Sequence, residues 1–364
     1  MQPGMIRSPR RSNGSLPLRG ALLLLLLAGI AGACRHVPVR SAPPVAPLLW
    51  PPPPDVPRIE YLGEVRIPAD AGIRSNWFVR FVGRVFLGPR RDGMARPYAV
   101  AVGFEGAILV ADPDARCVHL FDVTRGKYRR LDRAGDEPLV SPVGIATDAA
   151  GRIYVADSVR RAVFRFDPSG RWLDTIGGGD RLIRPTGLAF DSERDRLYVV
   201  DTLAHRILVL DASGRTVGEI GRRGQADGEF NFPVAVALDR TGRIFVSDSM
   251  NFRVQVLEAD GRFVRAFGEA GSGAGGFDKA KGIALDADGN IYVVEGLHDV
   301  VQVFDGEGRL STVLGSSGSG PGEFDLPAGI HVDGNGRILV ADSANHRIVL
   351  FHYLGDPGRV GEGS

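Results

Sequence analysis

The chain has 364 residues, of which 44% are hydrophobic and 24% charged, and this composition excludes an intrinsically disordered protein. The 44 basic and 43 acidic residues nearly cancel, so the overall charge gives no indication of a nucleic-acid partner. The 49 glycines and 24 prolines favour many short strands joined by tight turns over long helices.

Residues 1–33 have the features of an export signal. Four arginines precede an apolar run of thirteen residues, Ala21–Ala33, which is shorter than the roughly 17 to 25 residues that span a bilayer. The run leads into Cys34, and the sequence Ile-Ala-Gly-Ala-Cys resembles the bacterial lipobox, which implies that Cys34 is lipidated. The alternative is an ordinary cleaved signal with an incidental cysteine. Lipidation would leave Cys117 without a disulfide partner, and we expect Cys117 to be a small buried hydrophobic residue in a strand.

Residues 34–57 are predicted to form a proline-rich linker. Nine prolines lie between Val37 and Pro57, and polyproline geometry makes such a segment a stiff spacer that rises about 3.1 Å per residue. A lipid anchor followed by a spacer of this kind would hold a domain away from a membrane surface.

Residues 74–94 are predicted to contain one short amphipathic helix. Apolar side chains recur at helical spacing in the range 77–86, and Arg74, Arg80 and Arg84 lie on the opposite side. We expect this helix to pack against the domain that follows. The alternatives are an interfacial helix on anionic lipid and a surface that docks a partner.

Six repeats occupy residues 95–354. Each repeat begins with a variant of one sequence motif, which is seen in Ser141–Asp148, Arg184–Asp191 and Leu326–Asp333. The motif is followed by a predicted strand that is rich in β-branched residues and ends in an acidic residue. The six strand-end acids are Asp112, Asp157, Asp201, Asp248, Glu295 and Asp342, at steps of 44 to 47 residues. Two further strands follow in most units. Four short strands at a period near 45 residues predict a blade of a β-propeller, and the loops hold no segment long enough for the helix of a βαβ repeat.

Two of the repeats carry a family resemblance. The segments Asp342-Ser-Ala-Asn-His-Arg-Ile-Val-Leu and Asp201-Thr-Leu-Ala-His-Arg-Ile-Leu-Val resemble the NHL repeat, and the proline-rich stalk is similar to that of exported bacterial NHL lipoproteins. The resemblance implies an all-β, six-bladed propeller over residues 95–354, followed by a short tail at 355–364.

The sixth repeat lacks a fourth strand, and residues 58–73 are predicted to supply it. Glu60–Gly63 aligns with Arg265–Gly268, the fourth strand of another unit. Because an unpaired edge strand promotes aggregation, we expect the N-terminal strand to close the ring, with Tyr61–Gly63 alongside Arg347–Phe351.

The motifs indicate structure more than catalysis. The strand-end acids are expected to accept backbone N–H bonds in the turn that follows each of them, and His205 and His346 belong to the turn of the repeat itself. No sequence motif of a metalloprotease, a serine hydrolase or a phosphate-binding loop occurs.

A candidate site comes from the positions where the repeats break their own pattern. Lys281 is the only residue at its repeat position that is charged at neutral pH, Glu295 and His298 replace the usual turn residues, and His331 replaces a small inner-strand residue. Together with Tyr98 of the first unit, these side chains are predicted to form a polar ligand-binding pocket on one face. The alternative is neutral drift in a solvent-filled channel.

The preferred function is a non-catalytic binding or scaffold module of the bacterial cell envelope. It would be lipid-anchored in the periplasm or outside the cell, with the outer membrane favoured, and would be monomeric, without a cofactor, and bind a protein or a glycan. The first alternative is a propeller lyase or lactonase-type hydrolase, because such relatives hold Ca²⁺ or Zn²⁺ near the central channel. The second is an RNA-binding ring, which export argues against.

Overall fold

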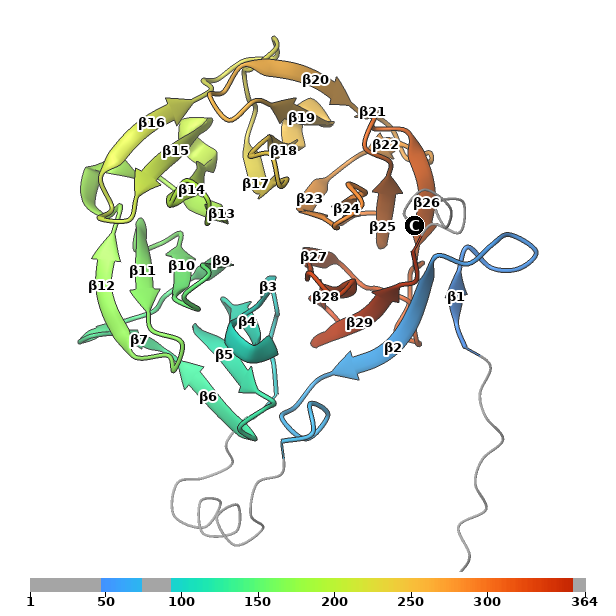
Figure 1. Cartoon of the computed structure of the whole chain (residues 1–364), viewed down its shortest axis with the longest axis horizontal. Helices are drawn as coiled ribbons and strands as arrows, with labels where there is room; N and C mark the ends of the chain where they lie inside the picture. Colours follow the sequence, from blue (N-terminus) through green and yellow to red (C-terminus); the bar gives the residue numbers. More distant parts are fainter. Residues whose placement is uncertain (1–46, 74–92, 356–364) are drawn as a thin grey trace, which may run out of the picture. The chain divides into compact units, whose positions relative to one another are not determined.

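The computed structural model describes residues 47–73 and 93–355, and these residues form a ring of six β-sheets around a central channel (Figure 1). The predicted export signal, the lipidation of Cys34 and nearly all of the amphipathic-helix segment 74–94 lie outside the described residues. The all-β, six-bladed prediction is confirmed. The helices within the described ranges are short 3₁₀ turns: η1 (Phe104–Gly106), η2 (Gly179–Arg181), η3 (Thr202–Ala204) and η4 (Ser249–Asn251).

Each blade is an antiparallel sheet whose first strand lies nearest the channel. Blade 1 holds β3 (Ala99–Val102), β4 (Ile108–Asp112), β5 (Cys117–Asp122) and β6 (Lys127–Leu131), and blade 2 holds β9 (Pro142–Thr147), β10 (Ile153–Asp157), β11 (Ala162–Phe166) and β12 (Trp172–Ile176). Blade 3 holds β13 (Pro185–Asp191), β14 (Arg196–Asp201), β15 (Arg206–Asp211) and β16 (Thr216–Ile220), and blade 4 holds β17 (Pro233–Leu238), β18 (Ile244–Asp248), β19 (Arg253–Leu257) and β20 (Phe263–Phe267). Blade 5 holds β23 (Ala280–Leu285), β24 (Ile291–Glu295), β25 (Val300–Phe304) and β26 (Leu310–Leu314). Blade 6 begins with β27 (Pro327–Val332), β28 (Arg337–Asp342) and β29 (Arg347–Tyr353), and two short ladders, β7 (Arg133–Ala134) with β8 (Glu137–Pro138) and β21 (Glu269–Ala270) with β22 (Gly276–Phe277), lie outside the blades.

The hydrophobic core is divided into six clusters, one between each pair of neighbouring blades. The second strand of a blade packs on both sides, so that every residue of β10 is buried, whereas the outer strand β12 is mostly exposed. In the cluster between blades 1 and 2, Leu120 and Val155 are both buried. Because each sheet buries both faces against its neighbours, the apolar residues form near-continuous runs in the second strands.

The ring closes through the N-terminal strand, as predicted. Strand β2 (Ile59–Val65) pairs antiparallel with β29, and it places Tyr61 opposite Phe351 and Gly63 opposite Leu350, with a bulge between the two pairs. One part of the linker prediction is wrong, because Leu49–Trp50 forms β1, a fifth strand of blade 6 that pairs with β2. The Trp50 ring packs edge-on against Phe351 at 5.6 Å between centroids, which explains why this end of the proline-rich segment joins the blade.

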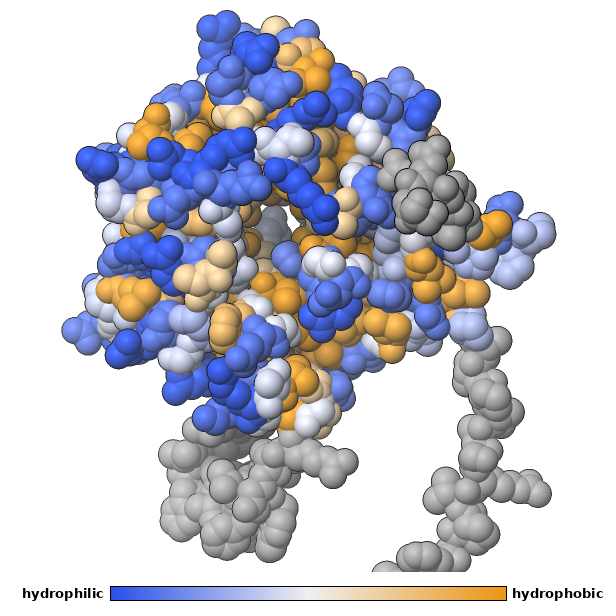
Figure 2. Space-filling view, in the orientation of Figure 1, coloured by the Kyte–Doolittle hydropathy of each residue, from blue (hydrophilic) through white to orange (hydrophobic). Residues whose placement is uncertain are grey.

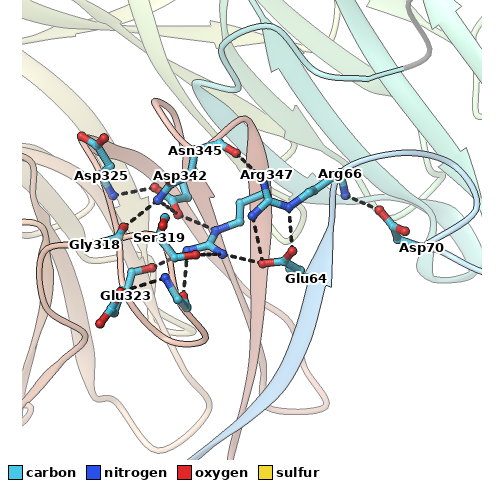
Figure 3. Close-up of polar contacts among 11 residues, drawn as sticks. Glu64, Arg66, Asp70, Gly318, Ser319, Glu323, Asp325, Asp342, Asn345 and Arg347 are labelled. Atoms are coloured by element: carbon cyan, nitrogen blue, oxygen red, sulfur yellow. Dashed lines mark hydrogen bonds and ion pairs between the residues drawn. The ribbon is translucent and has the colours of Figure 1, made fainter.

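An ionic network holds the closing strand in place (Figure 3). Arg347, which is 1% exposed, donates from Nε to Asp342 Oδ2 at 2.7 Å and from one terminal nitrogen to Glu64 Oε2 of β2 at 2.5 Å. Its terminal nitrogens also donate to three backbone carbonyls of the loop 319–323. Arg66 binds Glu64 from the other side at 2.6 Å. The first and last segments of the propeller are therefore joined by charge-assisted hydrogen bonds as well as by a strand ladder.

Candidate functional site at the channel mouth

The strand-end acids form a structural ring that fixes the backbone. All six are fully buried, and each accepts N–H bonds from the loop that leads into the inner strand of its own blade. In blade 5, Glu295 accepts from the N–H of Lys279 at 2.9 Å and from the N–H of Leu297 at 3.1 Å. The predicted role as acceptors of backbone N–H bonds is confirmed, but bonds from the turn that follows the acid occur for Asp112, Asp157 and Glu295, and the loop before the inner strand supplies the bonds that all six share. These carboxylates are occupied and are not available to a ligand.

The turns after these acids define one face of the ring, which we call the upper face. It consists of the loops 113–116, 158–161, 202–205, 249–252, 296–299 and 343–346. The last residue of each turn has a left-handed φ of 52° to 57°, and these residues are Arg116, Arg161, His205, Phe252, Asp299 and His346. His205 accepts the N–H of Phe232 at 3.1 Å, and Asp299 accepts the N–H of Leu326 at 2.8 Å. Asp299 therefore accepts a backbone N–H of the next blade, as His205 does. This shared role explains why aspartate can replace histidine at this position of the repeat.

In blades 3 and 6, a hydroxyl group in the turn after the strand-end acid donates a hydrogen bond to a backbone carbonyl of the next blade. In blade 5, Lys281 makes this interblade bridge, and Gly296 stands where the hydroxyl residue would be. Thr202 donates to the carbonyl oxygen of Pro233 in the next blade at 2.7 Å, and Ser343 donates to that of Pro97 at 2.6 Å. In blade 5 the equivalent position is Gly296, and Lys281 Nζ donates to the carbonyl oxygen of Pro327 at 2.9 Å instead. A Cβ at residue 296 would lie 2.2 Å from Lys281 Cε, so the glycine makes room for the lysine.

Because Lys281 and Gly296 compensate for each other, substitutions at the two positions are expected to have coupled effects on the free energy of unfolding. Lys281→Val is expected to lower the free energy of unfolding by about 1–3 kcal/mol, because the Pro327 carbonyl loses its donor. Adding Gly296→Ser should recover most of this loss, since the serine hydroxyl can donate as Ser343 does. Urea denaturation of the two variants measures the difference. A double variant no more stable than Lys281→Val would contradict the assigned bridge.

The mouth of the channel on the upper face is a polar cavity of about 260 Å³. Tyr98 and Lys281 line it, as do Arg96 and Arg184 from the loops that lead into blades 1 and 3. Burial lowers the pKa of Lys281 to about 8, and Lys279 and Arg96 add like-charge repulsion. Burial also raises the pKa of the Tyr98 hydroxyl. Figure 2 shows an opening at the centre of one face, bordered by both hydrophilic and hydrophobic residues.

The structure places two of the five predicted site residues, Tyr98 and Lys281, in the lining of the mouth, and it brings Glu295 and His298 within 4.0 Å of each other outside that lining. Glu295 is buried under its own turn, and His298 pairs with Asp278 at 3.0 Å. His331 lies three residues beyond the Ala328 position of the mouth, about 10 Å along the strand. Burial lowers the pKa of His331 to about 4, so this imidazole is neutral at physiological pH. Tyr98 and Lys281 therefore share the mouth without Glu295, His298 or His331.

Below the mouth the channel narrows to an apolar cavity of about 80 Å³. All six inner strands line it, mostly with aliphatic side chains and glycine backbone. Such a lining offers few polar groups to a ligand. The chemistry of the channel is therefore concentrated at its upper mouth.

A second cluster has the residue types of a cysteine nucleophile and its base, but it is sealed. His119 Nε2 lies 3.6 Å from Cys117 Sγ and 3.3 Å from Asp112 Oδ2, and all three residues are fully buried. Burial raises the pKa of the Cys117 thiol to about 11, so it stays protonated at neutral pH. The buried, strand-bound Cys117 agrees with the prediction. His119 occupies the place of Gln255 in blade 4, which donates to Asp248 at 3.0 Å.

This equivalence predicts that the imidazole is structural. His119→Gln is expected to lower the free energy of unfolding less than His119→Leu does, because glutamine can donate to Asp112 as Gln255 donates to Asp248, whereas both variants lose the 2.7 Å hydrogen bond between His119 Nδ1 and the Tyr128 hydroxyl. His119→Leu removes the donor and should cost about 1–3 kcal/mol. Denaturant unfolding of both variants provides the comparison. Equal losses in the two variants would show that the side-chain donor to Asp112 does not matter.

Neither a metal-binding cluster nor a membrane-spanning helix occurs among the described residues. Among residues 47–73 and 93–355, no three His, Cys, Asp or Glu side chains form a group that could hold a metal ion. Within the same ranges no helix is long and apolar enough to span a bilayer.

Comparisons with known proteins agree with the class of fold. Residues 237–296 and 284–356 match the family DUF5128, described as a 6-bladed beta-propeller. No curated protein matches the chain. A structural genomics protein of unknown function from Bacteroides thetaiotaomicron superposes with a TM-score of 0.57 at 18% identity, over 72% of this chain and 70% of that one.

Two enzyme structures are similar in fold. Virginiamycin B lyase from Staphylococcus aureus gives a TM-score of 0.54 at 14% identity, over 71% of this chain and 96% of that chain. A putative gluconolactonase gives 0.55 at 15% identity, over 72% and 90%. At such identities the likeness shows the fold alone, so the chain is a six-bladed β-propeller.

Sequence reasoning missed Arg96 and Arg184, although a signal for them exists. Both stand immediately before the proline of the repeated motif, where the other units carry Ser141, Phe232, Lys279 and Leu326. The candidate site is therefore the channel mouth, defined by Arg96, Tyr98, Arg184 and Lys281.

Proposed function

We propose that the chain is a non-catalytic binding module that presents its upper face to a protein partner. The observation that carries this proposal is a set of exposed apolar side chains at one repeat position, two residues after the strand-end acid. Val159 is 61% exposed, Leu203 43%, Met250 50% and Leu297 56%. Single exposed apolar residues are ordinary, but four at equivalent places around one opening are typical of an interaction surface.

The kind of side chain favours a protein over a glycan. Val159, Leu203, Met250 and Leu297 are aliphatic or thioether side chains, which pack against other apolar side chains without a preferred polar geometry. Ile183 and Leu326, also exposed, lie in the loops that lead into blades 3 and 6 and add to this surface. The repeated polar groups beneath it are engaged in holding the loops, as shown above for the strand-end acids. The upper face is thus rigid and apolar at its turns, which suits binding.

Export and lipid anchoring at Cys34 form the second part of the proposal. The basic leader, the short apolar run and the lipobox-like ending support it, and they would place the propeller at the bacterial envelope. Metabolic labelling with a fatty-acid analogue tests this part. The full chain should incorporate the label and Cys34→Ala should not, whereas labelling of the variant would overturn the assignment.

The binding proposal is tested by capture from the native host with matched variants of the full chain. Leu203→Ser combined with Leu297→Ser should reduce the recovery of a specific protein about tenfold or more, because apolar anchors at the centre of interfaces carry most of the binding energy. Phe104→Ser is the control, since Phe104 is 46% exposed on the opposite face of the ring. Equal recovery with all variants would exclude the upper face as the binding surface.

A further inference from the structure

Three cationic side chains meet at the channel mouth without a carboxylate partner. Arg96 and Arg184 take part in backbone bonds to Asp112 and Asp201, but their guanidinium groups make no hydrogen bond or ion pair with any residue in the described ranges. Lys281 uses one N–H for the Pro327 carbonyl and retains two further donors. Other arginines of the ring are paired with carboxylates, among them Arg152, Arg165, Arg206, Arg253, Arg337 and Arg347.

The charges around Lys281 leave the mouth net positive. Lys279 and Arg96 repel the ammonium, and Glu295 and Asp299 attract it. These two carboxylates also accept backbone N–H bonds, Glu295 from Lys279 and Leu297 and Asp299 from Leu326, and together with Asp114 they offset part of the charge of the four cations Arg96, Arg184, Lys279 and Lys281. Among the described residues that line the cavity, Asp114 is the one acid, and it is exposed to solvent, as Arg96 and Arg184 are. Like charges that converge on a partly enclosed space attract a counter-ion.

Neutral donors complete the lining. The Tyr98 side chain faces the cavity and lies within electrostatic reach of both Arg96 and Arg184. Ser141 and Ser158 lie on the blade 2 side, where the Ser158 hydroxyl donates to the Ser141 hydroxyl at 3.2 Å. Guanidinium groups, an ammonium and hydroxyl groups around a cavity of about 260 Å³ are the groups that proteins use for oxygen anions.

We propose that Arg96, Arg184 and Lys281 bind an oxyanion, a carboxylate or phosphate group, at the channel mouth. The inference rests on the proposed function only for the source of the anion, which would be an acidic or phosphorylated group of the partner. The exposed apolar residues of the upper face would then contact the partner around this anionic group. Small anions test the site itself, so the result does not depend on finding the partner.

The experiment is a calorimetric titration of the purified full chain at low ionic strength and pH 7, with inorganic phosphate and with citrate, and with chloride as the control for non-specific screening. We expect saturable binding of at least one oxyanion. Arg96→Gln combined with Arg184→Gln should weaken it about tenfold or more, because the anion loses its charge-assisted hydrogen bonds to both guanidinium groups. Lys281→Val combined with Gly296→Ser removes the charge while keeping the interblade bridge, and should weaken binding about tenfold. Arg215→Gln, at an exposed ion pair, should have no effect.

The pH dependence gives a second readout. The pKa of Lys281 is about 8, so its charge is complete well below pH 8 and is lost as the pH rises past that value. Citrate carboxylates stay ionised over this range, so citrate should bind several-fold more weakly at pH 9 than at pH 7, and the paired Lys281→Val and Gly296→Ser variant should lose this dependence.

Each outcome has a distinct meaning. Binding of phosphate alone assigns a phosphate-bearing ligand, and binding of citrate alone assigns a carboxylate. Binding no stronger than that of chloride, or binding unchanged in the Arg96 and Arg184 variants, would overturn the anion site. Neither result alters the capture experiment, so failure of the anion site is distinguishable from failure of the proposed function.

Discussion

Gly144→Ala is expected to lower the free energy of unfolding by about 3 kcal/mol or more and to reduce the yield of folded protein. A Cβ at residue 144 would lie 1.9 Å from the carbonyl oxygen of Thr186 in the next blade. That contact is with backbone, so it cannot be relieved by turning a side chain, and the inner strands must separate. Thermal and urea denaturation measure the loss.

The glycine of the repeated motif allows the same close approach of neighbouring inner strands in three other blades. A Cβ at Gly187, Gly282 or Gly329 would come within 2.6–2.7 Å of the backbone of the following blade. Gly334→Ala is the matched control, because nothing lies within 4 Å of its added methyl group, and it should change stability by less than about 0.5 kcal/mol. Similar losses at residues 144 and 334 would refute the close approach of inner strands.

Arg347→Met should be the most damaging change at the closure. It leaves the buried Asp342 and the partly buried Glu64 without their shared cation, and breaking a buried pair in this way costs about 3–5 kcal/mol. The loop 319–323 also loses the donor to its carbonyl groups. The free energy of unfolding from urea titration gives the magnitude, and proteolysis near residue 65 would report release of β2.

An arginine-to-methionine substitution at an exposed ion pair is the control. It measures how much stability is lost when an arginine is removed at a place that does not close the ring. Arg309 pairs with Asp305 at 2.7 Å, but its side chain is 77% exposed, so Arg309→Met should lower the stability far less than Arg347→Met does. If Arg347→Met were equally mild, the strand ladder alone would hold the ring, and the network in Figure 3 would contribute little.

The number of blades and their closure could be predicted because both depend on patterns that repeat. The strand-end acids fixed the period, and the missing fourth strand after His352 required a partner, which Glu60–Gly63 matched. Strand β1 could not be predicted. A strand of two residues is too short to show a periodicity in the sequence. Leu49–Trp50 forms a strand in the folded blade, where Trp50 packs against Phe351.

The candidate site shows how far exceptions to a repeat can be interpreted. Lys281 and Tyr98 were predicted as site residues, and both line the mouth. Glu295 and Asp299 also depart from the repeat, but each performs the backbone bonding of the residue it replaces. A sequence exception shows that a position differs, and only the three-dimensional neighbours show whether the difference is compensated. Arg96 and Arg184 share a position in the repeat, but they belong to blades that are not adjacent, so their convergence is seen only in the closed ring.

The upper face as the binding surface is the central claim, and site-specific photo-crosslinking in the native host tests it most directly. A photoreactive amino acid replaces Leu203 on the upper face in one variant and Phe104 on the opposite face in another, two positions of similar exposure, 43% and 46%. We predict a discrete crosslinked protein adduct from position 203 and none from position 104. Adducts from position 104 alone, or from neither position, would contradict the assignment.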